Sequence, residues 1–265
     1  MLLTLARIAT EEGGFHAPTV DEFFPGELIF AGTPFAMTRI NLIGMIVTAI
    51  IVVFFVTAFA RPKLVPRGVQ NLGEMAVDVV YDQVIREVLG SKGKKYAPYL
   101  VAMFWLLFCF NITGIIPFAQ IAVTSVIGLP LLLALVSWFV FNVEGIRAHG
   151  FGHYLKMNLF PPGIPWPIYF LVTPIEFVST FILRPLTLTI RLMANMMSGH
   201  LLLVLFFSAT SALLAADGLM KVFAIPSYIM GLAFTFFEIL VAVLQAYIFT
   251  LLTAVYIDGA TSAEH

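Results

Sequence analysis

Polar side chains interrupt two long apolar stretches in the last third of the 265-residue sequence, and their types are those that handle ions. Arg191, Asn195 and His200 lie in the first stretch, and Glu238 and Gln245 lie in the second. Imidazole and carboxyl groups exchange protons, whereas a guanidinium stays protonated. Ionisable groups at membrane depth are costly and usually face a cavity, a partner or an ion path. If the two stretches lie in a membrane, the pattern predicts an ion path.

Arg191 has no acidic residue among its helical neighbours. The residues three and four positions away on either side are Thr187, Leu188, Ala194 and Asn195. The nearest acid in the same stretch is Glu176, which is about 22 Å away along a helix axis. A guanidinium cannot lose its charge to avoid the cost of desolvation. We therefore expect its counter-charge to be a carboxylate on another membrane subunit.

The two stretches are expected to pair as an antiparallel helical hairpin that turns around 217–221. Facing residues in such a hairpin have position numbers with a nearly constant sum, so His200 should oppose Glu238, and Arg191 should oppose Gln245. Glu238 and Gln245 are seven residues apart and share one helix face. A facing imidazole and carboxyl group suit a proton relay; the other interpretation is a static buried ion pair.

The composition excludes a water-soluble chain. Apolar residues make up 60% and charged residues 11%, with 26 Phe and a formal net charge of −1, whereas a typical soluble domain is about a quarter charged. Too few charges remain to cover a soluble surface, which excludes a soluble enzyme, a disordered chain and a nucleic-acid-binding protein. The single Cys109 excludes an internal disulfide.

Apolar segments of membrane length define the expected fold class. A spanning helix needs about 20 mostly apolar residues, and segments of that length lie at 40–60, 99–118 and 121–141, the last two joined by a two-residue link. Two further stretches, 173–216 and 227–257, would be about 66 and 46 Å long as helices, against a hydrocarbon core of about 30 Å. We therefore predict an all-α integral membrane protein with three ordinary spans and a long, strongly tilted C-terminal hairpin.

Lysine and arginine predict the orientation through the positive-inside rule. The segment 61–97 holds seven of the 14 Lys and Arg residues and is placed in the cytoplasm, whereas 1–39 holds two and is placed outside. By parity, the tail at 258–265 is cytoplasmic. The single domain at 40–257 is then expected in the cell inner (plasma) membrane.

Between the first two predicted spans, polar residues recur at helical spacing. Asn71, Glu74, Asp78, Asp82 and Arg86 fall on one stripe, with apolar residues over the rest of the surface. The pattern predicts an amphipathic helix that lies on the cytoplasmic face of the membrane. A solvated helix packed on the spans fits the same pattern.

Other classes of function account less well for these residues. A secondary cation/proton transporter is the main alternative, but such proteins usually have two related halves, and no repeat is visible here. His149 and His153 have the spacing of a zinc pair in HGFGH, but no HExxH motif is present and the glycines favour a loop. No cofactor, metal site or catalytic nucleophile is therefore expected.

Two segments resemble subunit a of the bacterial F-type ATP synthase. They are RPLTLTIRLMANMMSGH at 184–200 and FEILVAVLQAYIFTLLTAVY at 237–256. The order of Arg, Asn four residues later, Gly-His, and then Glu and Gln seven apart is distinctive. GVQNLGEMAVDVV and NITGIIPF are also similar, so the resemblance covers about residues 40–257.

The resemblance implies a non-catalytic subunit that acts as the stator for a rotating ring of c subunits, each with one membrane carboxylate. Arg191 matches the arginine that displaces the proton from an arriving carboxylate and separates two offset half-channels. The residues matching the proton path are His200, Glu238, Asn195 and Gln245 on the external side, and Glu176 on the cytoplasmic side. The family also implies b subunits of the peripheral stalk and membrane lipid as partners.

Overall fold

The computed structural model describes residues 27–29, 37–116, 121–160 and 165–262, and nearly all of them are helical. The α-helices are α2 (Arg39–Phe59), α3 (Val69–Val80), α4 (Arg86–Leu89), α5 (Gly93–Ile112), α6 (Gly128–His149), α7 (Phe151–Leu159), α8 (Tyr169–Phe177), α9 (Arg184–Ala215) and α10 (Ala224–Thr261). Segments Tyr81–Ile85 and Val178–Leu183 are π-helical, and Gly90–Lys92, Val123–Ser125, Trp166–Ile168 and Gly218–Phe223 are 3₁₀-helical. Strands β1 (Glu27–Ile29) and β2 (Met37–Thr38) form one antiparallel pair.

Within the described ranges, five continuous helical stretches are long and apolar enough to cross a membrane. They are Arg39–Phe59, Val69–Ile112, Gly128–His149, Trp166–Ala215 and Gly218–Thr261. Many of their large apolar side chains are exposed on the isolated chain, as expected for surfaces that lipid or partner helices cover. The prediction of an all-α integral membrane protein is confirmed.

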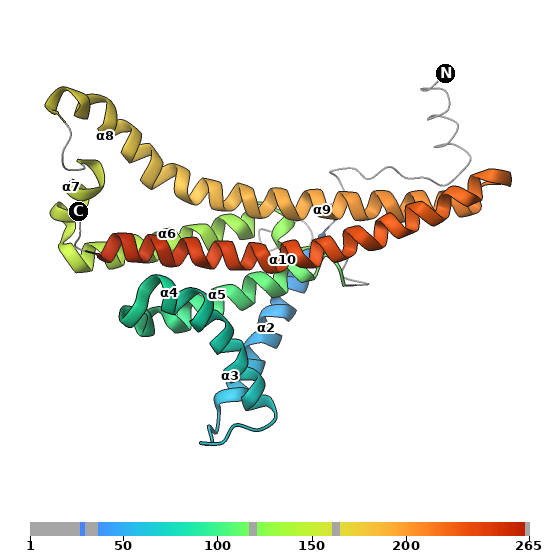
Figure 1. The fold of residues 1–265 in the computed structure, drawn as a ribbon, viewed down its shortest axis with the longest axis horizontal. Helices are drawn as coiled ribbons and strands as arrows, with labels where there is room; N and C mark the ends of the chain where they lie inside the picture. Colours follow the sequence, from blue (N-terminus) through green and yellow to red (C-terminus); the bar gives the residue numbers. More distant parts are fainter. Residues whose placement is uncertain (1–26, 30–36, 117–120, 161–164, 263–265) are drawn as a thin grey trace.

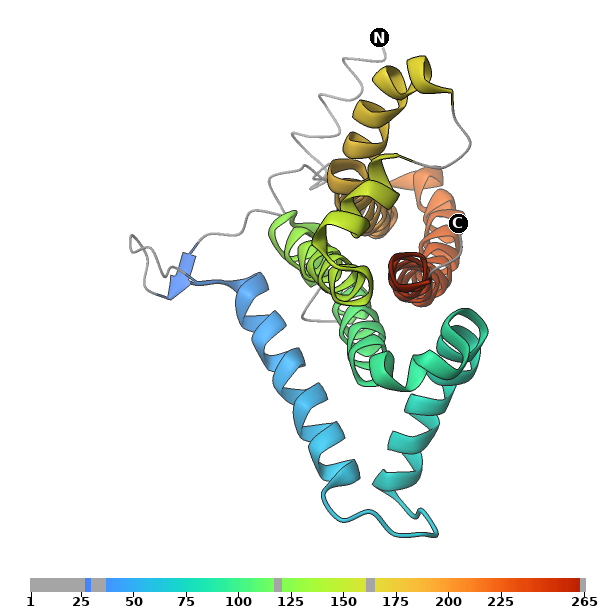
Figure 2. The ribbon, with the colours of Figure 1, turned by 90° about the vertical axis from the view of Figure 1, so that its left-hand side faces the viewer.

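The longest helices, α9 and α10, lie antiparallel along the long axis of the molecule (Figure 1). Helices α5 and α6 pack against this pair and run in nearly the same direction, so Figure 2 shows all four almost end-on. Helix α2 leaves the group at a wide angle and mainly contacts α3. Hydropathy predicts α5 and α6 to be ordinary spans like α2, whereas the structure places them with the C-terminal pair.

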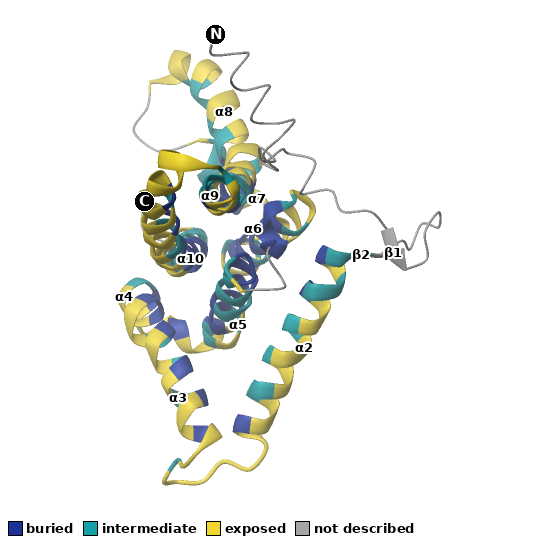
Figure 3. Cartoon of the chain, turned by 90° about the vertical axis from the view of Figure 1, so that its right-hand side faces the viewer, coloured by how far each residue is buried: buried dark blue, intermediate teal, exposed yellow. Residues whose placement is uncertain are grey.

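The main core lies where α5, α6, α9 and α10 meet (Figure 3). Leu100 and Leu107 of α5, Phe141 of α6, Leu192 of α9 and Phe249 of α10 are almost fully buried there. Helix α2 contributes few buried side chains, because most of its surface faces away from the bundle. The four packed helices therefore form a rigid support for the exposed residues of α9 and α10.

The C-terminal hairpin turns where the sequence predicts. Helix α9 ends at Ala215, and Gly218 adopts a φ of 72°, which side chains disfavour, within the predicted turn 217–221. Next to the turn, the Thr210 hydroxyl donates to the Ser227 hydroxyl oxygen at 3.0 Å. The predicted antiparallel pairing of the two helices is confirmed.

The link between α5 and α6 is longer than predicted. Helix α5 ends at Ile112 and α6 begins at Gly128, so the predicted two-residue link and the helix start at residue 121 are wrong; residues 119 and 120 themselves lie outside the described ranges. The Thr113 hydroxyl donates to the Phe110 carbonyl at 2.6 Å and accepts from the Val123 N–H at 3.2 Å. The segment is as apolar as a span, but side-chain hydrogen bonds replace helical ones and turn the backbone.

The helical stretch Trp166–Ala215 is continuous but bent, and it starts before the predicted residue 173 (Figure 1). Its α8 and α9 portions are joined by the π-helical segment Val178–Leu183, just before Pro185. A proline has no N–H, and its ring displaces the carbonyl four residues earlier. Pro185 therefore accounts for the bend without ending the helix.

The predicted polar stripe lies on α3 and continues into the π-helical segment Tyr81–Ile85 and α4. Its Asn71, Asp78, Asp82 and Arg86 are exposed and Glu74 is half-buried. Arg86 pairs with Asp82 at 3.8 Å. On the opposite side, Gly73, Ala76 and Val80 are buried against α2 and α5. The helix is amphipathic as predicted, and its place on a membrane face stays a prediction.

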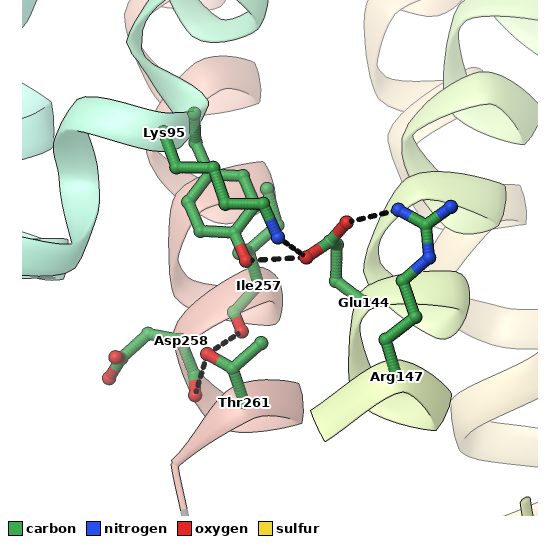
Figure 4. Close-up of polar contacts among 7 residues, drawn as sticks. Lys95, Glu144, Arg147, Ile257, Asp258 and Thr261 are labelled. Atoms are coloured by element: carbon green, nitrogen blue, oxygen red, sulfur yellow. Dashed lines mark hydrogen bonds and ion pairs between the residues drawn. The ribbon is translucent and has the colours of Figure 1, made fainter. Parts of the chain in front are cut away.

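A charged cluster joins α5 to α6 beside the end of α10 (Figure 4). Glu144 of α6, which is 9% exposed, accepts hydrogen bonds from the Tyr96 hydroxyl at 2.8 Å and from Arg147 Nη1 at 3.1 Å. Lys95 forms an ion pair with the same carboxylate. Buried Ile257 of α10 lies next to this cluster. The shared carboxylate fixes the ends of two helices on which the C-terminal hairpin packs.

Candidate functional site

A groove of about 300 Å³ runs between α9 and α10 and gathers most of the predicted site. Arg191 and Asn195 line it from α9, and Glu238 and Gln245 line it from α10. Much of the remaining lining is apolar, including Phe234. Four of the six side chains predicted for ion translocation therefore lie in one place, although they come from positions far apart in the sequence.

Asn195 and Gln245 connect the two helices inside this groove. The Asn195 side-chain amide donates to Gln245 Oε1 at 3.0 Å, and Gln245 is only 3% exposed. Arg191 is predicted to lie opposite Gln245, but the hydrogen-bonded partner of Gln245 is Asn195, one helical turn further along α9. The amide pair thus holds the two helices together beside the arginine.

Glu238 lies against a gap that a glycine leaves in α9. A Cβ built on Gly199 would lie 2.9 Å from Glu238 Oε1, closer than real Cβ contacts come. Glu238 is 2% exposed, and neither of its carboxyl oxygens has a hydrogen-bond partner in the part of the chain that the structure describes. In the sequence, Gly199 is noted only as part of a motif. A glycine inside a helix costs about 1 kcal/mol relative to Ala, and this cost is the signal that could have identified its role.

His200 lies on another face of α9 and lines a second cavity of about 670 Å³. Arg39, Gly114 and Thr235 also line this cavity. His200 is predicted to face Glu238, but no hydrogen bond joins the imidazole to the carboxyl group in the part of the chain that the structure describes. Consecutive residues of an α-helix are about 100° apart, so Gly199 faces Glu238 while His200, 5% exposed, faces the second cavity. The imidazole therefore lies outside the groove, on the residue that follows Gly199.

Arg191 is exposed on the outer side of the hairpin. No acidic side chain of the described residues lies within ion-pair distance of its guanidinium, and no hydrogen bond from it to these residues is formed. Its neighbour Ile190 is 46% exposed. The cation thus lies on an apolar surface of the isolated chain, beside the groove that holds the amide pair and Glu238.

Glu176 lies apart from the groove. It belongs to α8, on the other side of the π-helical segment from Arg191, and is half-buried. The His149 and His153 rings are 5.9 Å apart, and the described residues contain no group of three or more His, Cys, Asp or Glu side chains that could hold a metal.

The fold and this groove define an all-α, multi-pass membrane protein with ion-handling groups between two long helices. Comparison with known proteins narrows the class. The model of the family described as ATP synthase A chain matches residues 42–258. An ATP synthase subunit a of Rhodococcus erythropolis is 47% identical over 264 residues, which are 99% of this chain and 95% of that protein.

Two further relatives with the same name come from Parafrankia sp. and Frankia alni. They are 43% and 40% identical, and the alignments cover 96% and 95% of this chain and 86% and 88% of the relatives. The chain belongs to the ATP synthase subunit a family. It is a non-catalytic subunit of the membrane sector of the bacterial F-type ATP synthase, and family membership excludes the secondary transporter considered above.

Proposed function

We propose that the chain is the proton-conducting stator of this membrane sector, with two offset half-channels that lead to the carboxylates of a c-ring and with Arg191 between them. The observation that carries the proposal is the position of Arg191. Arg191 is exposed, has no acidic partner among the described residues, and lines the same groove as Glu238 and Gln245. A permanently charged group on an apolar surface needs a carboxylate from elsewhere.

The external half-channel is assigned to the second cavity and the groove. Arg39, at the start of α2, lines that cavity, and the segment before it is expected outside the membrane. Protons would reach His200 from the cavity and pass around α9 at Gly199 to Glu238. From Glu238, the amide pair of Asn195 and Gln245 leads along the groove toward Arg191. Both ionisable groups on this route can exchange protons.

The cytoplasmic half-channel is assigned to the region before the start of α9, where Glu176 lies on α8. Moving one charge through 100 mV is worth about 2.3 kcal/mol, and this energy drives rotation only if no continuous proton path crosses the membrane. Arg191 keeps the two paths separate, because a hydronium ion or a protonated relay is disfavoured beside a fixed cation. An arriving carboxylate pairs with the arginine and releases its proton.

The exposed apolar surfaces have different proposed partners. The Arg191 side of the hairpin faces the c-ring, whose carboxylate completes the site. The outward side of α2, where Ile50, Val53 and Val56 are 61–62% exposed, is left for b subunits of the peripheral stalk and for membrane lipid. In this orientation the N-terminal segment is outside and the C-terminal tail is cytoplasmic.

Crosslinking tests the identity of the partner at Arg191. Cys109 is first replaced by Ala, and a photo-reactive crosslinker is attached to Ile190→Cys in the assembled complex. We expect capture of a small c subunit, identified by mass spectrometry. The matched control is Ile50→Cys on α2, an exposed isoleucine on the other side of the molecule, which should not capture a c subunit. Equal capture from both positions, or from Ile50→Cys alone, would contradict the proposal.

A further inference from the structure

The helix that carries Arg191 has a π-helical segment between Glu176 and Arg184. In this segment, Val178–Leu183, the Arg184 N–H donates to the Ser179 carbonyl, five residues back. Such a π turn takes up one more residue than an α turn and is frequent at functional sites. Its position just before Pro185 has a physical cause, since a proline ring displaces the carbonyl four residues earlier.

The side of the helix that faces α10 is marked by Asn195. We measure the angle of each residue about the helix axis from Arg191, at about 100° per residue. Asn195 then lies about 40° from Arg191 on the side of α10, where it meets Gln245. Exposed Ile190 lies about 100° from Arg191 on the opposite side. An uninterrupted α-helix would place Glu176 about 60° to the Ile190 side. The extra residue in the π turn shifts this angle by about 100°, which brings Glu176 to about 40° on the Asn195 side.

One contact and the burial of two residues agree with this rotation. The Arg184 guanidinium carbon lies 5.1 Å from the centre of the Tyr256 ring, so the first residue of α9 faces α10. Eight residues separate Glu176 from Arg184, but the π turn makes them equivalent to seven, which is about two α-helical turns and the same face. Within the turn, Thr180 is only 1% exposed. Glu176 itself is half-buried, as expected on the inner side of the helix.

We propose that the π turn at Val178–Leu183 is a positioning element for ion translocation, and that it rotates Glu176 from the outer surface of the helix to the side that faces α10. The proposal rests on the proposed function, because it assigns Glu176 to the cytoplasmic half-channel. Sequence spacing alone does not show that Glu176 faces α10. Glu176 and Arg191 are fifteen positions apart, but because of the π turn their angle about the helix axis is that of residues fourteen positions apart in an α-helix.

Changes in chain length test the proposal in reconstituted complexes. Deletion of Ser179 removes the extra residue and restores an α-helix with the same facing relationship, so ATP-driven proton pumping should stay within about twofold of the parent. Insertion of one Ala between Ser179 and Thr180 moves Glu176 back to the outer side and should lower pumping about tenfold. In the insertion background, Glu176→Phe with Phe177→Glu returns the carboxylate to the inner side and should restore pumping. The same exchange without the insertion should lower it.

Each result supports or overturns the inference. Unchanged pumping by the insertion variant, or no recovery with the exchanged residues, overturns it. Unchanged pumping by Glu176→Gln also overturns it, whereas the proposed function fails if an assembled Arg191→Ala complex still pumps protons at the parent rate. If the deletion and insertion variants do not assemble, substitutions in the Glu176→Gln background test the proposal instead. Val172→Glu, on the same face, should recover more pumping than Ile175→Glu, about 100° away, and the reverse order contradicts the proposal.

Discussion

The side-chain amide of Asn195 donates to Gln245 Oε1 at 3.0 Å, and this bond joins α9 to α10 one helical turn beyond Arg191. It is a contact between residues fifty positions apart, and it fixes the level at which the two helices meet. The arginine needs such a fixed frame, because its guanidinium has no ion-pair partner of its own among the described residues. The amide pair therefore positions the arginine relative to the groove.

Removal of either side-chain amide should have a small effect on the stability of the complex. Interhelical hydrogen bonds in membranes are worth about 0.6 kcal/mol on average. Asn195→Ala and Gln245→Ala should each destabilise the subunit by about this amount, and the double variant should cost no more than one of them. Thermal dissociation of the purified complex measures the effect. Additive losses in the double variant would show that the two residues act separately.

A methyl group at position 199 should displace Glu238. The added Cβ of Gly199→Ala would lie 2.9 Å from Oε1, and the flexible carboxyl end can move away at little cost in stability. We expect proton pumping to fall between about tenfold and a hundredfold, because small displacements of a reacting group are costly. Gly259→Ala, where the new Cβ meets no atom within 4 Å, is the matched control and should pump normally. Equal activity of both variants would exclude a role for the gap at Gly199.

The cluster around Glu144 should contribute to stability rather than to transport. Tyr96→Phe removes a buried hydrogen bond to this carboxylate and should destabilise the complex by about 1 kcal/mol. Pumping per assembled complex should be unchanged. Tyr81→Phe is the control, since the Tyr81 hydroxyl makes no hydrogen bond to the described part of the chain. A loss of pumping by Tyr96→Phe without any change in thermal stability would contradict this interpretation.

The apolar pattern predicts helices well and their ends less well. The segment 40–60 corresponds closely to α2, because a helix satisfies the backbone hydrogen bonds of an apolar run of membrane length. Hydropathy misses the break at Thr113, where a hydroxyl group satisfies the backbone within an apolar run. It also carries no information about direction, so the shared orientation of α5, α6, α9 and α10 is visible only in the structure.

The sequence predicts which residues of α9 and α10 lie at the same level to within about one helical turn, but it does not predict the face of the helix on which each residue lies. The constant-sum rule places Glu238 at the level of His200, and the structure confirms the level. The same rule cannot tell which face of α9 a residue occupies, so Gly199 rather than His200 contacts the carboxyl group. Glu176 has the same difficulty, because the π turn that sets its angle depends on the local backbone around Pro185.

ATP-driven proton pumping by vesicles that contain the Arg191→Ala complex tests the central claim most directly. The comparison is with Arg86→Ala, which removes an exposed arginine of α4 that pairs with Asp82 outside the groove. Both complexes are quantified, so that pumping is expressed per assembled enzyme. We expect no pumping from Arg191→Ala and normal pumping from Arg86→Ala. Pumping by an assembled Arg191→Ala complex at the parent rate would contradict the proposed role of the arginine.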